Sequence, residues 1–197
     1  MRKSSIVLAA FVIPLRRWHW WRKRDQLSRV RLLVLDVDGV LTDGGLWYGP
    51  GGELIKRFDV RDGLGIRLLQ QAGVEVAFLS GGRGGATDTR AAHLGIRHCL
   101  VGVGDKPAAL ARLQMELEMA IEATAFVGDD VNDLAARPQA GLLVATANAA
   151  LPLRQQADLV LEREGGQGAV RELAEKLLRP TPLWRDINND GWRERND

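Results

Sequence analysis

The chain has 197 residues, of which 46% are hydrophobic, which favours one domain with a substantial core and short appended segments. Residues 1–31 hold nine of the 27 Lys and Arg residues and one of the 25 acids, which leaves 18 basic and 24 acidic residues, a net charge of −6, for the rest. This acidic remainder excludes the basic surface typical of nucleic-acid-binding domains. Cys99 is the only cysteine, so an intrachain disulfide is excluded and a cytoplasmic, reducing compartment is favoured.

Residues 1–29 predict a basic, Trp-rich N-terminal extension. An apolar run at 6–13 follows two basic residues, but it lacks a clear cleavage site and is far shorter than the ~20 residues that cross a bilayer. The basic and aromatic cluster at 16–24 suits contact with an anionic membrane surface or a partner. We favour the simpler interpretation of a loosely ordered extension, or a start site placed too early.

Strand and helix patterns alternate between residues 30 and 180. Short apolar runs predict strands at 31–35, 74–79, 124–127, 141–145 and 158–161, and helical patterns occupy 62–72, 86–94, 106–118 and 168–178. Such alternation predicts a parallel sheet with helices on both faces, a doubly wound α/β fold. The polar segment 181–197 is predicted to be a loose C-terminal tail.

Residues 46–58 interrupt this alternation directly after the first predicted strand. Two short apolar segments flank Gly49-Pro50-Gly51-Gly52, a pattern that predicts a β-hairpin. A hairpin at this point in the chain is expected to hang over the carboxyl edge of the sheet, where open α/β sheets bind ligands.

Two acidic clusters follow predicted strands. Asp36 and Asp38 come directly after the first strand, and Asp129, Asp130 and Asp133 come after the strand at 124–127. Because the carboxyl ends of parallel strands meet at one edge of a sheet, we expect these side chains to lie together. Carboxylate-rich clusters suit Mg²⁺, and paired aspartates suit phosphoryl transfer with one nucleophile and one acid/base.

A phosphate site is predicted from two further elements. Ser80-Gly81, after the strand at 74–79, offers a hydroxyl group and an unhindered backbone N–H to phosphate oxygens. Lys106, at the start of a predicted helix, supplies a cation that can pair with the phosphate and with the nucleophile. Either feature alone is ordinary, since Ser-Gly often makes a plain turn and such a lysine is often solvated. Their order between the two acidic clusters favours the functional interpretation.

These elements, in this order, resemble the four motifs of the haloacid dehalogenase (HAD) superfamily of phosphatases. More narrowly, residues 30–178 resemble the family of 3-deoxy-D-manno-octulosonate 8-phosphate (KDO 8-phosphate) phosphatases. The narrower resemblance rests on the hairpin in place of a cap domain and on the segments 58–67, 93–96 and 165–172.

The resemblance implies a Mg²⁺-dependent phosphatase that forms an aspartyl-phosphate on Asp36. Asp38 is then the residue that protonates the leaving sugar oxygen and activates water. The implied metal ligands are Asp36, the backbone carbonyl of Asp38, and Asp129, with Asp130 or Asp133 orienting metal-bound water. Lys106, Ser80 and Gly81 are implied to hold the phosphoryl oxygens.

The resemblance also implies which residues bind the sugar and how the chain assembles. The implied sugar-binding residues are Asp59, Val60, Arg61, Asp62, Gly63, Arg67 and Arg90. Guanidinium groups and backbone amides suit a substrate with a carboxylate and many hydroxyls; the alternative is that Arg61 and Arg67 are surface charges at a helix start. The family resemblance implies a homotetramer in which hairpin 46–58 closes a neighbouring site.

Gly82 departs from the pattern of that family, whose second motif usually runs Thr/Ser-Gly-Arg. Here the order is Ser80-Gly81-Gly82-Arg83, so the arginine is displaced by one residue. A lost charge-assisted hydrogen bond costs ~1.5–3 kcal/mol, enough to weaken or shift specificity. Gly82 therefore keeps open a phosphatase of a related sugar, such as a nonulosonate 9-phosphate. The basic leader suggests a second alternative, a non-catalytic HAD-like module at a membrane surface.

Overall fold

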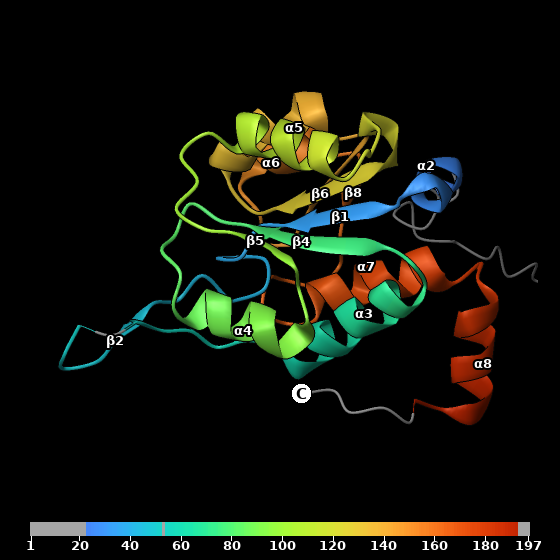
Figure 1. Ribbon diagram of the computed structural model, residues 1–197, viewed down its shortest axis with the longest axis horizontal. Coiled ribbons are helices and arrows are strands. Elements are labelled where there is room, and N and C mark those ends of the chain that lie inside the picture. The colour runs from blue at the N-terminus through green and yellow to red at the C-terminus, as the bar shows by residue number, and fades with distance from the viewer. Residues whose placement is uncertain (1–22, 53, 193–197) are drawn as a thin grey trace, which may run out of the picture.

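A six-stranded parallel sheet forms the centre of the protein in this computed structural model, which describes residues 23–52 and 54–192 (Figure 1). The strand order is β5-β4-β1-β6-β7-β8. The bounds are β1 (Leu32–Leu35), β4 (Glu75–Leu79), β5 (His98–Leu100), β6 (Thr124–Gly128), β7 (Leu142–Ala145) and β8 (Leu159–Val160). The predicted doubly wound α/β fold is confirmed, and β1 lies between β4 and β6.

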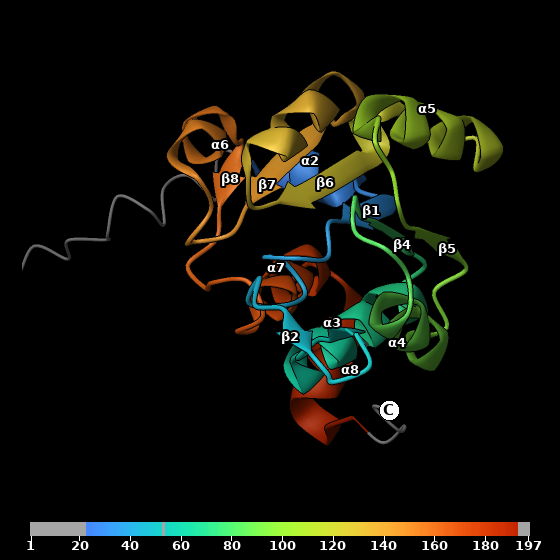
Figure 2. The same cartoon turned by 90° about the vertical axis from the view of Figure 1, so that its left-hand side faces the viewer.

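Helices cover both faces of the sheet, as Figures 1 and 2 show. One face carries α3 (Val60–Gln71), α4 (Ala86–Leu94), α7 (Ala169–Leu178) and α8 (Pro182–Asp190). The other carries α5 (Lys106–Glu116), η2 (Val131–Gln139) and α6 (Leu151–Gln156). Two short helices, α2 (Arg24–Arg29) and η1 (Ile121–Ala123), precede β1 and β6 respectively.

The central strand β1 is buried on both sides, which explains its unbroken run of apolar residues. Leu33 and Leu35 belong to the core shared with α3 and α7, whereas Leu32 and Val34 belong to the core shared with α5. All four side chains have no exposed surface. A parallel strand covered on both faces requires apolar residues at every position, because neither face meets water.

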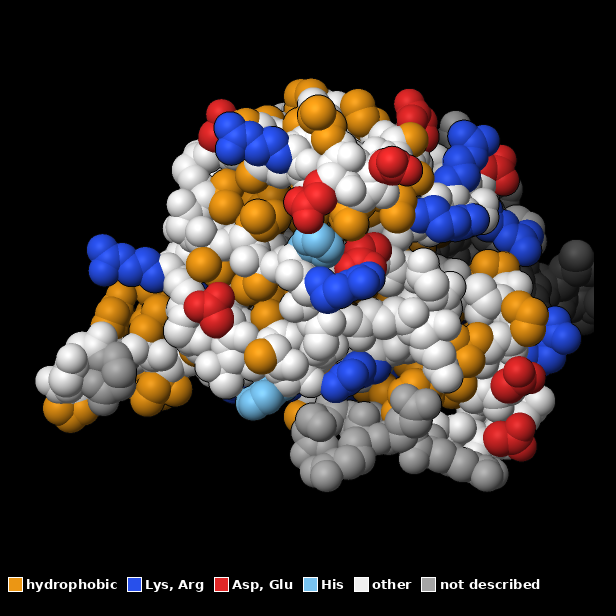
Figure 3. All heavy atoms as spheres, in the orientation of Figure 1, with side chains coloured by type: hydrophobic (Ala, Val, Ile, Leu, Met, Phe, Trp, Pro, Cys, Tyr) orange, Lys and Arg blue, Asp and Glu red, His pale blue; other side chains and the backbone are white. Residues whose placement is uncertain are grey.

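The predicted hairpin is present as β2 (Trp47–Tyr48) and β3 (Leu54–Ile55), paired antiparallel. It projects from the body of the protein, at the left of Figure 1, and Figure 3 shows hydrophobic side chains gathered on it. Trp47 is 68% exposed and Tyr48 is 71% exposed. Large apolar side chains this exposed are typical of a contact surface.

The structure differs from the sequence prediction at the end of the extension. Residues 24–29 form α2, whose Leu27 is buried in the core, and the Lys23 ammonium pairs with Asp158 at 3.0 Å. The folded domain therefore begins before residue 30. The apolar run at 6–13 and most of the basic cluster, with the alternative of a membrane contact, lie outside the described residues. Within the described residues, no helix combines the length and apolar character needed to cross a membrane.

The predicted loose tail is largely helical instead. Residues 182–190 form α8, and Leu183, Trp184, Ile187 and Trp192 pack against the α3–α7 core. Thr181 caps the helix by accepting the backbone N–H of Trp184 at 3.2 Å. The apolar residues recur at helical spacing among polar neighbours, so the segment buries one face despite its polar composition.

We expect Trp184→Ala to lower the free energy of unfolding by about 1–3 kcal/mol, because the substitution removes a partly buried aromatic side chain from the core. The Arg171 guanidinium also lies 5.9 Å from the Trp184 ring centre, and alanine cannot provide this cation–π interaction. Urea denaturation measures the change, with Arg185→Ala on the exposed side of α8 as control. Equal stability of the two variants would contradict the packing of α8.

Candidate active site

Residues from the carboxyl ends of three neighbouring strands meet around one cavity. The strands are β1, β4 and β6, which the fold places side by side. The cavity has a volume of about 350 Å³. Its lining comes from the two acidic clusters and the Ser-Gly turn: Asp36, Asp38, Ser80, Gly81, Gly82 and Asp129, with Asp130, Val131 and Asn132 at the start of η2. The predicted meeting of these segments is therefore present in the structure.

Gly39 allows the two acidic clusters to approach each other. Its φ is +86°, a left-handed conformation that residues with a side chain rarely adopt. A Cβ atom at position 39 would lie only 2.0 Å from Asp129 Oδ2. Glycine is therefore required both for the turn after Asp38 and for the space that the Asp129 carboxylate occupies.

Lys106 joins the nucleophile candidate to the second acidic cluster. Its ammonium lies 3.1 Å from Asp36 Oδ1 and 2.5 Å from Asp133 Oδ1, and all three side chains are almost fully buried. The other oxygen of Asp133 accepts the backbone N–H groups of Asp129, at 2.8 Å, and Asp130, at 3.3 Å. Asp133 thus holds both the lysine and the loop that carries Asp129.

The pKa values of this cluster reflect burial and mutual repulsion. Burial, followed by repulsion from Asp133, raises the pKa of Asp36 to about 6 despite the Lys106 ammonium. Burial, followed by repulsion from Asp36, raises the pKa of Asp129 to about 7. For Lys106, burial lowers the pKa, but Asp36 and Asp133 together hold it above its usual value. The cluster carries more negative charge than one lysine neutralises.

A divalent cation fits this cluster. Asp36, Asp129 and Asp133 each place one carboxylate oxygen within 4.8 Å of the others. Hard oxygen ligands of this kind suit Mg²⁺, and a cation relieves the repulsion that raises their pKa values. Because Asp133 already accepts three hydrogen bonds, Asp36 and Asp129 are the carboxylates better placed to serve as ligands. The predicted ligand role of the Asp38 carbonyl stays a prediction.

Asp130 caps the helix η2 that follows the second acidic cluster. Its Oδ1 accepts the backbone N–H of Val131 at 2.7 Å, and its side chain is exposed at the mouth of the cavity. The predicted role of Asp130 or Asp133 in orienting metal-bound water stays a prediction.

Lys56 is a site residue that sequence reasoning missed. It follows β3 directly, and its ammonium lies 2.8 Å from Asp38 Oδ2 and 3.4 Å from Thr87 Oγ1. The side chain is 1% exposed. In the sequence it is marked only by its place directly after the apolar pair Leu54-Ile55. A lysine at such a place is equally typical of an exposed charge on a hairpin.

The turn after β4 places position 82, and not Arg83, at the cavity. Ser80 Oγ accepts the backbone N–H of Gly82 at 3.0 Å. A Cβ atom on Gly82 would lie 3.1 Å from Asp38 Oδ2, so a side chain here would point into the site. Arg83 is exposed and is not among the described residues that line the cavity.

Curated relatives match this chain over most of their length. No protein-family model matches the chain. A 3-deoxy-D-manno-octulosonate 8-phosphate phosphatase of Escherichia coli strain K12 is 44% identical over 151 residues, which cover 77% of this chain and 80% of the relative. The enzyme of the same name from Haemophilus influenzae is 41% identical over 155 residues, or 79% of this chain and 86% of the relative. The chain belongs to this phosphatase family.

Solved structures agree with this assignment. The KDO 8-phosphate phosphatase of Moraxella catarrhalis, in complex with a magnesium ion, a phosphate ion and KDO, gives a TM-score of 0.82 at 34% identity and covers 85% of this chain and 97% of that one. The cobalt-bound Haemophilus influenzae enzyme gives 0.78 at 38% identity, covering 85% and 96%. A hydrolase from Legionella pneumophila, described as a HAD superfamily member, gives 0.81 at 35% identity, covering 87% and 93%. The predicted superfamily and family are confirmed.

The residues that the family resemblance assigns to the sugar lie outside the cavity of the single chain. The side chain of Asp59 caps α3 by accepting the backbone N–H of Arg61, and the two side chains pair at 2.6 Å. Val60 is 74% exposed. Arg61 also donates to the Gln167 carbonyl at 3.1 Å. A hydrogen bond therefore joins the start of α3 to the loop before α7.

The two other predicted sugar-binding arginines lie between α3 and α4. Arg67 donates to the His93 carbonyl at 2.7 Å. The Arg90 guanidinium lies 5.8 Å from the centre of the Phe58 ring, and a Cβ atom on Gly63 would lie 2.3 Å from Arg90 Nη2. A side chain at position 63 would therefore displace the Arg90 guanidinium from its present position. The sugar-binding roles of both arginines stay predictions.

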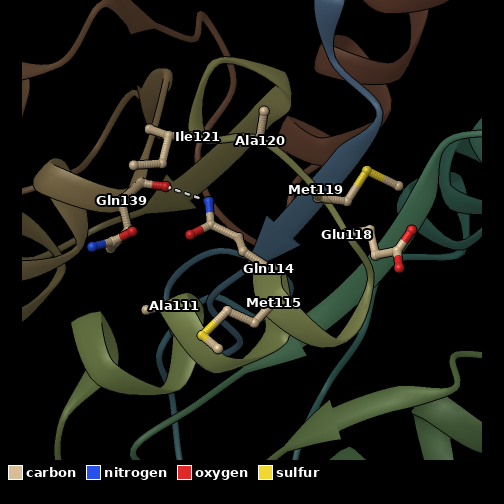
Figure 4. A pocket seen from close by; sticks show the side chains of 8 residues that line it. All are labelled: Ala111, Gln114, Met115, Glu118, Met119, Ala120, Ile121 and Gln139. Atoms are coloured by element: carbon tan, nitrogen blue, oxygen red, sulfur yellow. Dashed lines mark hydrogen bonds between the residues drawn. The ribbon is translucent and has the colours of Figure 1, made fainter.

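A second hollow lies between the C-terminal part of α5 and η1, about 540 Å³ in volume (Figure 4). Its lining is mainly apolar and includes Met115, Met119 and Ile121. The hydrogen bond drawn in Figure 4 runs from the Gln114 amide to the Gln139 carbonyl. Glu118 is the only titratable residue among those that line it, so it offers no pair of groups for acid/base chemistry.

We expect Asp62→Asn to stabilise the protein increasingly as the pH rises. Asp62 Oδ1 accepts the Arg171 backbone N–H at 2.8 Å, while Oδ2 has no partner among the described residues. Burial raises the pKa of Asp62 from 3.8 to about 6, so the stability contributed by its protonated form is present below pH 4 and lost as the pH rises through 6. Asparagine keeps the acceptor without ionising.

The stability gained from Asp62→Asn should be about 1–3 kcal/mol larger at pH 7.5 than at pH 4.5, measured by urea denaturation with EDTA present. Asp186→Asn, on the exposed side of α8, is the matched control and should show a much smaller pH dependence. A gain that is the same at both pH values would exclude ionisation of Asp62 as its cause.

Proposed function

We propose that this protein is a Mg²⁺-dependent phosphatase that hydrolyses 3-deoxy-D-manno-octulosonate 8-phosphate to KDO and phosphate. The observation that carries the proposal is the buried Asp36–Lys106–Asp133 cluster beside Asp129 at the carboxyl edge of the sheet. The substrate follows from family membership, because the Moraxella catarrhalis relative is described with magnesium, phosphate and KDO.

The reaction proceeds in two displacements at phosphorus. A carboxylate oxygen of Asp36 attacks, the bond between phosphorus and the sugar oxygen breaks, and Asp38 donates a proton to that leaving oxygen. Asp38 then removes a proton from water, which attacks the aspartyl-phosphate. The bond between phosphorus and Asp36 breaks, and phosphate leaves with Asp36 restored.

The neighbouring residues neutralise charge and position the reacting groups in these steps. Lys106 orients the Asp36 carboxylate and neutralises phosphoryl oxygens, and Ser80 with the Gly81 backbone N–H binds those oxygens. Asp36 and Asp129 are the carboxylates that would hold Mg²⁺, which would supply charge neutralisation for the incoming phosphate. Asp133 keeps Lys106 and the Asp129 loop in place through its three hydrogen bonds.

Substrate recognition is proposed to involve a second copy of the chain. The cavity of one chain is open, and the arginines of α3 and α4 bind other parts of the same chain. The exposed apolar side chains of hairpin 46–58 support a homotetramer in which this hairpin closes a neighbouring site. A cytoplasmic location is proposed from the single free cysteine.

A related sugar phosphate remains the second candidate substrate. Gly82 faces the cavity where the family usually has an arginine, and this position is the specific reason to include a nonulosonate 9-phosphate in any substrate test. The non-catalytic alternative is not favoured, because a chain without catalysis has no need to keep the charges of Asp36, Asp38, Lys106 and Asp129 together.

Phosphate release from a panel of sugar phosphates tests this function. We expect the highest kcat/KM with KDO 8-phosphate, no activity with EDTA, and full recovery on adding Mg²⁺. Asp36→Asn should lower kcat by at least about 1000-fold, because it removes the nucleophile. Activity that survives EDTA or the substitution would defeat the mechanism, whereas equal rates with all sugar phosphates would defeat only the choice of substrate.

The assembly is tested by placing negative charges on the exposed strand β2 of the hairpin. We expect Trp47→Asp combined with Tyr48→Asp to convert a tetramer into smaller species in sedimentation analysis, because exposed aromatic side chains can no longer be buried between copies. The KM for KDO 8-phosphate should rise at least about tenfold, while thermal unfolding of the isolated fold changes little. An unchanged mass with an unchanged KM would contradict the closing of a site by a neighbour.

A further inference from the structure

Lys56 carries a buried positive charge that the mechanism above does not use. It stands at the base of the hairpin, immediately after β3, and its side chain is 1% exposed. Burial of an ammonium group is costly unless a negative partner compensates for the lost water. The position therefore requires a compensating interaction.

That compensation comes from Asp38, the proposed acid/base. The distance from Lys56 Nζ to Asp38 Oδ2 is 2.8 Å, and Thr87 Oγ1 of α4 lies 3.4 Å from the same ammonium. The Asp38 side chain is itself 31% exposed to the cavity. The lysine thus approaches from the buried side and leaves the other side of the carboxyl group open to a ligand.

The two catalytic aspartates therefore have separate lysines. Lys106, from α5, contacts Asp36, whereas Lys56, from the hairpin, contacts Asp38. Gly82 lies beside the second pair, because a Cβ atom there would lie 3.1 Å from Asp38 Oδ2 and 3.6 Å from Lys56 Nζ.

We propose that Lys56 is a positioning residue that holds the Asp38 carboxyl group against the cavity wall, where it meets the leaving oxygen of the substrate. Lys56 itself touches neither the phosphorus nor the leaving group. This inference rests on the proposed phosphatase function. Since Lys56 belongs to the hairpin, it also links the position of the hairpin base to the proton-transfer step.

Leaving-group dependence separates this role from a merely structural one. An alkoxide of a sugar is a poor leaving group and needs a proton, whereas 4-nitrophenolate leaves without one. The value of kcat/KM reports the steps up to release of the leaving group, before water attacks the aspartyl-phosphate. Loss of Asp38 positioning should therefore lower kcat/KM for a sugar phosphate much more than for 4-nitrophenyl phosphate.

The experiment compares Lys56→Met with the unmodified protein on KDO 8-phosphate and on 4-nitrophenyl phosphate, both with Mg²⁺. We expect kcat/KM to fall at least about 30-fold for the sugar phosphate and less than about threefold for the aryl phosphate. Lys56→Arg should restore part of the activity. Arg97→Met, which breaks an exposed pair with Glu75, is the matched control and should match the unmodified protein on both substrates.

A double-mutant cycle with Asp38→Asn shows whether the two residues act together. If Lys56 acts through Asp38, adding Lys56→Met to Asp38→Asn should lower kcat/KM for the sugar phosphate by less than about threefold. Thr87→Val, which removes the second partner of the ammonium, is a milder variant should Lys56→Met fold poorly. It should show a few-fold decrease with the same preference for the aryl phosphate.

Three results would overturn the inference. Equal decreases of kcat/KM on both substrates would place Lys56 in phosphate binding or in stability alone, and unchanged values would remove any role. Additive decreases in the double variant would show that Lys56 acts independently of Asp38. Failure of the unmodified protein to hydrolyse KDO 8-phosphate is a failure of the proposed function, and the Lys56 comparison then proceeds with the best alkyl phosphate of the panel.

Discussion

The concentration of negative charge at the carboxyl edge of the sheet is the constraint on which the rest of the site depends. Asp36, Asp129 and Asp133 are held within a few ångströms of one another, where burial and repulsion raise the pKa values of Asp36 and Asp129. Lys106 offsets part of this charge, and a divalent cation fits the remainder. A phosphate can enter only if this negative charge is balanced, so the lysine and the metal site are conditions for the chemistry.

The hairpin connects assembly to catalysis in this arrangement. Its exposed strand β2 offers Trp47 and Tyr48 to a partner, while Lys56, directly after β3, contacts Asp38. One short element thus serves the proposed neighbour contact and the proposed positioning of the acid/base. A capless phosphatase of this kind is expected to depend on the hairpin for tasks that a separate domain performs elsewhere.

Most strands and the main helices could be predicted because their apolar periodicity is strong, whereas short or polar elements could not. β5 spans only His98–Leu100 and is half-buried, and η2 contains Pro138, so neither gives a clear pattern. The segment after residue 181 has a polar composition that hides the helical spacing of the residues it buries. Local composition is a poor guide wherever tertiary packing supplies the stability.

The chemistry of this protein could be predicted from local patterns, because Asp36, Asp38 and Asp129 follow strand ends, and parallel strand ends must meet at one edge of a sheet. Which charges pair depends on the tertiary structure. The roles of Asp133 as the anchor of Lys106, and of Lys56 as the partner of Asp38, depend on distances between segments far apart in the chain. No local pattern encodes those distances; the packing of helices and hairpin around the sheet sets them.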